Sequence, residues 1–142
     1  MSGFTSREDT LPRFWKVYGY ANLIVDDHEV VRMGIRLLFP PNGPLQVCGE
    51  AEDGPDALQK VLELAPDVVI LDLTMPGMNG FETAMRIRQI APSIKIVFYS
   101  IHEIPTTARL SGADAFISKA STSQELITTV NRVMQSSGHV ET

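Results

Sequence analysis

The chain has 142 residues, of which 44% are hydrophobic and 20% are charged, and these proportions exclude a disordered or fibrous protein. The net charge of −5 and the scattered basic residues argue against a nucleic-acid surface, and no apolar run approaches the roughly 20 residues of a membrane span. Cys48 is the only cysteine, so it cannot form an internal disulfide, and its apolar neighbours predict a buried small side chain. We therefore expect one soluble domain in the reducing cytoplasm.

Hydrophobic runs and turn residues predict strands that alternate with helices from residue 21 onward. Residues 1–20 do not fit this pattern, and we treat them as an N-terminal extension of unknown role. The predicted strands lie at about residues 23–25, 45–51, 68–71, 94–99 and 115–117. The predicted helices lie at about residues 28–39, 55–65, 81–91, 105–111 and 123–134. Asp53 is predicted to cap the second helix and Ser123 the last one.

This alternation predicts a single α/β domain with a doubly wound parallel sheet. Right-handed crossovers and the flavodoxin-like strand order 2-1-3-4-5 would place the carboxyl ends of the first and third strands side by side. Asp26 and Asp27 follow the first strand, and Asp72 follows the third. Ser100 and Lys119 follow the fourth and fifth strands. We therefore expect these five side chains to converge in one crevice, where ligands bind in open α/β sheets.

The expected crevice holds residue types suited to phosphoryl transfer. Three carboxylates close together repel one another, so a cation is expected among them, and carboxylate oxygens suit Mg²⁺. A carboxylate can also attack phosphorus and form an aspartyl phosphate. The transfer then needs positive charge and a hydrogen-bond donor at the phosphoryl oxygens, which Lys119 and Ser100 could supply.

The combination of Asp26-Asp27, Asp72 followed by LTMPGMNG, Ser100 and Lys119 resembles the active site of response regulator receiver domains of two-component signalling. The similarity covers about residues 21–137. It implies that the protein is a phosphorylation-activated switch whose partner is a sensor histidine kinase. It also implies no enzymatic activity beyond phosphorylation and dephosphorylation of the protein's own aspartate.

The resemblance assigns a role to each motif residue. Asp72 would accept the phosphoryl group, Lys119 would pair with it, and Ser100 would move to hydrogen-bond it while Phe116 turns inward. The Mg²⁺ ligands would be Asp26, Asp27, Asp72 and the backbone carbonyl of Thr74, with Asp26 acting mainly through water. His28 and His102 are expected to be surface or loop histidines, because neither has a second ligand at metal spacing.

The opening VDDHEVVRMGI and the Lys119-Ala120 step resemble most the NarL/FixJ-type transcription regulators. These carry a helix-turn-helix DNA-binding domain after the receiver, so residues 138–142 would be a tail or the start of a linker, and DNA would be contacted only by a domain absent from this chain. A homodimer is possible. The interval from Ser100 to Lys119 looks about one helical turn shorter than usual, which predicts a short fourth helix.

Two other functions fit parts of the sequence. The shortened fourth helix motivates a receiver-like module that binds proteins without phosphorylation. A hydrolase of the haloacid-dehalogenase type would also use an aspartate nucleophile, but it needs an acid two residues later, where this chain has Thr74. Flavin binding is disfavoured because the loop after the first strand is acidic where a phosphate needs donors.

Overall fold

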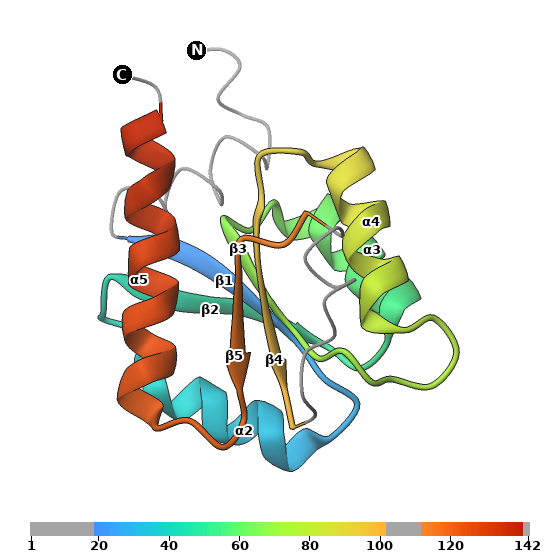
Figure 1. Cartoon of the computed structure of the whole chain (residues 1–142), viewed down its shortest axis with the longest axis horizontal. Helices are drawn as coiled ribbons and strands as arrows, with labels where there is room; N and C mark the ends of the chain where they lie inside the picture. The colour runs from blue at the N-terminus through green and yellow to red at the C-terminus, as the bar shows by residue number, and fades with distance from the viewer. Residues whose placement is uncertain (1–18, 102–111, 141–142) are drawn as a thin grey trace.

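The computed structural model describes residues 19–101 and 112–140, which contain one parallel sheet of five strands (Figure 1). The strands are β1 (Tyr20–Val25), β2 (Leu45–Ala51), β3 (Val68–Leu71), β4 (Lys95–Ser100) and β5 (Ala115–Ser118). Their order across the sheet is β2-β1-β3-β4-β5, and every neighbouring pair is parallel. The predicted flavodoxin-like α/β fold is therefore confirmed.

Helices cover both faces of the sheet (Figure 1). They are α2 (Glu29–Leu38), α3 (Gly54–Leu64), α4 (Gly80–Ile90) and α5 (Ser123–Val140). One hydrophobic cluster joins the sheet to α3 and α4, and a second joins it to α2 and α5. The short helix predicted at 105–111 lies outside the described residues, as does the predicted extension up to residue 18. β1 begins at Tyr20, inside the range predicted for that extension.

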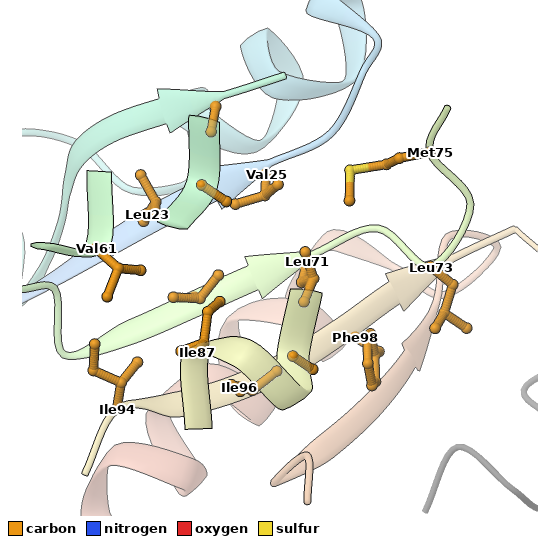
Figure 2. Packing of buried hydrophobic residues seen from close by; sticks show 14 residues of the cluster. Leu23, Val25, Val61, Leu71, Leu73, Met75, Ile87, Ile94, Ile96 and Phe98 are labelled. Atoms are coloured by element: carbon orange, nitrogen blue, oxygen red, sulfur yellow. The ribbon is translucent and has the colours of Figure 1, made fainter. Parts of the chain in front are cut away.

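β3 is the central strand, and all of its residues are buried. Leu71 joins the cluster against α3 and α4, whereas Ile70 joins the cluster against α2 and α5. A strand covered on both faces has apolar residues throughout, which explains the run that predicted it. Figure 2 shows Val25, Leu71 and Phe98 from three neighbouring strands on one face of the sheet. This packing fixes the position at which β3 ends.

Local side-chain caps set where two of the helices begin. Asp53 accepts a hydrogen bond from the backbone nitrogen of Asp56 at 2.9 Å, so the predicted cap of α3 is confirmed. The predicted cap of α5 at Ser123 is wrong, because that role belongs to Thr122. The Thr122 hydroxyl accepts from the Glu125 nitrogen at 3.1 Å, and the Glu125 carboxylate accepts from the Thr122 nitrogen at 2.9 Å. This reciprocal pair is a capping box, which satisfies two backbone donors.

Cys48 lies on β2, where the register with β1 shifts between Asn22 and Leu23. Its side chain packs against the cluster under α3 and α4 but is only half-buried, so the predicted burial is confirmed in part. Burial raises the pKa of the Cys48 thiol to about 12. The thiol is therefore protonated at neutral pH.

Gly80 lets α4 begin in contact with the backbone that follows β3. The Gly80 nitrogen donates to the Leu73 oxygen at 2.9 Å. A Cβ at this position would lie 2.3 Å from the Asp72 carbonyl oxygen and 2.6 Å from the Leu73 Cα. Neither neighbour is a flexible side-chain end, so a methyl group here must displace either α4 or the segment that carries Asp72.

We expect Gly80→Ala to destabilise the protein by about 1–3 kcal/mol, the usual cost of overpacking. The matched control is Gly34→Ala in the exposed face of α2, where a Cβ would have no neighbour within 4 Å among the described residues. That control should stabilise the protein by about 0.5–1 kcal/mol, because alanine loses less backbone entropy than glycine in a helix. Denaturant unfolding followed by circular dichroism measures both changes. Equal unfolding midpoints for the two variants would contradict this account.

Candidate functional site

Most of the predicted site residues lie at the carboxyl ends of the strands. Figure 1 shows these strands side by side in one sheet. Asp26 and Asp72 directly follow β1 and β3, Ser100 ends β4, and Lys119 directly follows β5. Backbone hydrogen bonds continue the sheet into these positions: the Asp72 nitrogen donates to the Val25 oxygen at 2.9 Å, and the Lys119 nitrogen donates to the Ser100 oxygen at 2.8 Å. The central strand order thus brings acids that are far apart in sequence to one edge.

Lys119 lies between two buried carboxylates. Its Nζ is 2.6 Å from Asp26 Oδ2 and 3.6 Å from Asp72 Oδ1. The side chains of these three residues are 11%, 2% and 6% exposed, respectively, so the charges interact through little water. The structure therefore brings together the amine and two of the acids in the predicted crevice.

Both carboxylate oxygens of Asp26 are used by the protein itself. Oδ2 accepts from Lys119, and Oδ1 accepts from the His28 backbone nitrogen at 2.9 Å. The Asp26 backbone nitrogen in turn donates to the Ala51 oxygen at 3.0 Å. A buried carboxylate with this many donors is held in a fixed orientation.

Asp27 differs from Asp26 because one of its carboxylate oxygens is buried without a hydrogen bond among the described residues. Its Oδ1 atom is buried and has no hydrogen-bond partner in the part of the chain that the structure describes. The His28 Nδ1 atom lies 3.2 Å from this oxygen but outside hydrogen-bond geometry. An unsatisfied buried carboxylate oxygen is costly, and a cation would remove the cost.

His28 contributes to the same group of atoms, contrary to its interpretation as an isolated surface histidine. Its side chain is 67% exposed as expected, but Nδ1 lies 3.3 Å from Asp26 Oδ1. Ligand atoms of Asp26, Asp27 and His28 all lie within 4.8 Å of one another. The two carboxylates form a hard oxygen donor set, which suits Mg²⁺.

Asp72 has a raised pKa. The principal cause is burial, followed by the negative charge of Asp26, whereas Lys119 and a hydrogen bond from the backbone of Thr74 act in the opposite direction. The Thr74 nitrogen donates to Asp72 Oδ1 at 3.3 Å, so this residue contacts the site through its amide. The prediction assigned a role to the carbonyl of the same residue.

Ser100 and Phe116 were predicted to act as a switch. The Ser100 residue is fully buried at the end of β4. Phe116 is half-buried and stacks on Phe98, with ring centroids 5.7 Å apart. The rings of Phe98 and Phe81 form a T-shaped pair with centroids 5.6 Å apart. In this conformation the Phe116 ring is therefore part of the packing between β5 and the core.

Two residues near the site were not predicted. Arg32 on α2 donates to the backbone oxygen of Asp26 at 2.6 Å, and the Tyr99 ring centroid lies 5.8 Å from Lys119 Nζ. Burial raises the pKa of Tyr99, so its hydroxyl is neutral at physiological pH. In sequence, Tyr99 looks like an ordinary strand residue, and Arg32 lies in the stretch VDDHEVVRMGI without any signal that its side chain faces the acids.

Across residues 19–101 and 112–140, no helix combines the length and the apolar character that crossing a membrane requires.

Comparison with known proteins gives a match to the response regulator receiver domain over residues 23–131. This range lies within the domain predicted at 21–137. The response regulator GacA of Pseudomonas aeruginosa is 36% identical over 114 residues, which cover 78% of this chain and 53% of that protein. The chain thus spans about half the length of the curated relatives it matches.

Solved structures give the same result. The receiver domain of the response regulator NarL from Mycobacterium tuberculosis matches with a TM-score of 0.77 and 32% identity, over 82% of this chain and 97% of that one. A LuxR-family two-component response regulator from Aurantimonas matches with a TM-score of 0.78 and 30% identity, over 83% and 86%. The chain belongs to the family of response regulator receiver domains.

Proposed function

We propose that the protein is a phosphorylation-activated receiver that accepts a phosphoryl group on Asp72 from a sensor histidine kinase. The observation that carries this proposal is the position of Lys119, whose ammonium contacts Asp26 and lies 3.6 Å from Asp72 Oδ1. An amine held beside a buried carboxylate at the ligand-binding edge of a parallel sheet is placed to neutralise an incoming phosphoryl group.

The donor set fits Mg²⁺. Asp27 is the natural direct ligand because its buried Oδ1 has no hydrogen bond among the described residues. Asp72 and the Thr74 carbonyl would complete the protein ligands, and Asp26 would act through water because both of its oxygens already accept hydrogen bonds. The bound ion supplies positive charge to the phosphoryl oxygens.

The transfer itself exchanges one bond for another. An Asp72 carboxylate oxygen forms a bond to phosphorus as the P–N bond of the kinase phosphohistidine breaks, and the electron pair stays on the imidazole nitrogen. Lys119 and the Ser100 hydroxyl are the protein groups proposed to hold the transferred oxygens. The chemistry is confined to phosphorylation and dephosphorylation of Asp72, because Thr74 stands where a hydrolase needs an acid.

We further propose that the intact protein controls transcription through a DNA-binding segment outside this sequence. The support is that the curated relatives are response regulators about twice as long as the matched region. Receiver and output would then be separate domains joined by a linker.

Treatment with acetyl phosphate and Mg²⁺ should add the mass of one phosphoryl group to the wild type, measured by intact-mass spectrometry. Asp72→Asn should remain unlabelled, because an amide is not nucleophilic toward phosphorus. The matched control is Asp53→Asn, which should label as the wild type does, because asparagine caps a helix as well as aspartate. An unlabelled wild type would instead favour a protein-binding module that works without phosphate.

Mg²⁺ should raise the thermal unfolding midpoint of the wild type, because an ion that binds only the folded state stabilises it. At about 100 times the dissociation constant the gain is about 2.7 kcal/mol. Asp27→Asn should remove most of this shift, while Asp53→Asn should keep it. Differential scanning calorimetry over a series of Mg²⁺ concentrations tests this prediction, and an equal shift in all three proteins would exclude Asp27 as a ligand.

Without divalent ions, Asp72→Asn should unfold at a higher temperature than the wild type at pH 7. The folded-state pKa of Asp72 lies above the ordinary value of 3.8. Between these two pKa values the folded protein binds more protons than the unfolded chain, so its stability falls as the pH rises through this interval. The advantage of the variant should therefore shrink as pH is lowered toward 3.8. Thermal unfolding in a chelating buffer at several pH values measures it. A constant difference between the two proteins at all pH values would show that the ionisation of Asp72 is not responsible.

A further inference from the structure

We propose that Arg32 is a positioning residue for the acidic pair: it fixes the peptide that joins Asp26 to Asp27 and so sets the direction of the Asp27 carboxylate. This inference rests on the proposed function, in which Asp27 binds Mg²⁺. Arg32 lies on α2, the helix that follows β1, whereas most of the other site residues lie at the ends of strands.

The contacts of Arg32 reach two parts of the fold at once. Nη1 donates to the Asp26 backbone oxygen at 2.6 Å, and Nε donates to Glu50 Oε1 on β2 at 2.9 Å. The Arg32 side chain is only 14% exposed. Glu50 also pairs with Arg36, the next arginine along α2. The guanidinium therefore donates to the Glu50 carboxylate through Nε and to the Asp26 backbone oxygen through Nη1.

The hydrogen bond from Arg32 to the Asp26 carbonyl determines the geometry of Asp27. The peptide unit is planar, so the Asp26 carbonyl, the Asp27 amide and the Asp27 Cα move together. The Asp26 side chain has its own anchors in Lys119 and the His28 amide. The buried Oδ1 atom of Asp27 has no hydrogen bond among the described residues, so the direction of its carboxylate depends on the backbone that Arg32 holds.

Arginine suits this role better than lysine. Its planar fork presents several donors at fixed angles, so one group can serve the Asp26 carbonyl and Glu50 together. Glu50, which Arg32 shares with Arg36, offsets part of the charge of the guanidinium, and the Lys119 ammonium is the group that contacts the Asp26 carboxylate. Arg32 thus acts on the site through hydrogen-bond geometry.

α2 offers a matched control one turn further along. Arg36 pairs with the same Glu50 from a half-exposed position, and among the described residues its side chain pairs with that carboxylate only. Arg32→Met and Arg36→Met each remove one link to Glu50, but only the first removes the donor to the Asp26 carbonyl. Arg32→Lys serves as a second variant in case Arg32→Met fails to fold, because a single ammonium cannot reproduce the fork.

The test uses two readouts on the full chain. The first is the Mg²⁺ concentration that gives half of the maximal thermal stabilisation. It should rise about 10–100-fold in Arg32→Met, as is usual when a group that orients a metal ligand is lost, and by less than about twofold in Arg36→Met. The second is the ¹⁵N amide signal of Asp27 in the metal-free protein, which should move in Arg32→Met and stay in place in Arg36→Met.

The outcomes separate this inference from the proposed function. A less stable Arg32→Met protein with unchanged half-saturating Mg²⁺ and an unmoved Asp27 signal would show that Arg32 merely links α2 to β2, and would overturn the inference. If the wild type itself shows no Mg²⁺ dependence, the proposed metal site fails. The ¹⁵N amide signal of Asp27 is then the only test. A shift of this signal in the Arg32 variants but not in Arg36→Met supports the positioning role, and no shift in the Arg32 variants refutes it.

Discussion

The structure depends on one ammonium group placed between two buried carboxylates. Lys119 lies 2.6 Å from Asp26 Oδ2 and 3.6 Å from Asp72 Oδ1, and none of the three side chains is more than 11% exposed. Buried charges of one sign are costly, and here a single cation offsets only part of the repulsion. The result is an acidic edge that is short of positive charge, which is the electrostatic condition for binding a divalent ion and a phosphoryl group together.

The fold produces this arrangement by where its strands end. β1 and β3 are neighbours in the sheet, so the residues after them lie side by side although 46 positions separate Asp26 from Asp72. Packing on both faces of the sheet leaves little freedom at these strand ends. Gly80 then brings the start of α4 against the backbone of Asp72, so the segment that carries the acid is supported from the helix side as well.

The acids of the site have unequal support, and this division suits their proposed roles. Asp26 is anchored by Lys119 and by a backbone amide, whereas Asp27 has a buried oxygen with no hydrogen bond in the described part of the chain. A fixed acid maintains the electrostatic balance, and an unsatisfied one is available to a ligand. Arg32 connects the two, since it holds the peptide between them and is itself tied to Glu50 on β2.

The sequence by itself determined the strands, the described helices and the edge at which the acids meet, because periodicity and turn residues are local signals and parallel strands share a carboxyl edge. It also indicated the cap at Asp53, but it misplaced the cap of α5, where Thr122 and Ser123 are both plausible until Glu125 selects one of them. Only the tertiary structure decided that Arg32 reaches Asp26 and Glu50, that His28 joins the acidic group, and that Phe116 stacks on Phe98. The Arg32 and Phe116 contacts depend on side-chain directions across packed elements, and the His28 contact depends on the path of the loop after β1. Residue order specifies neither until the chain has folded.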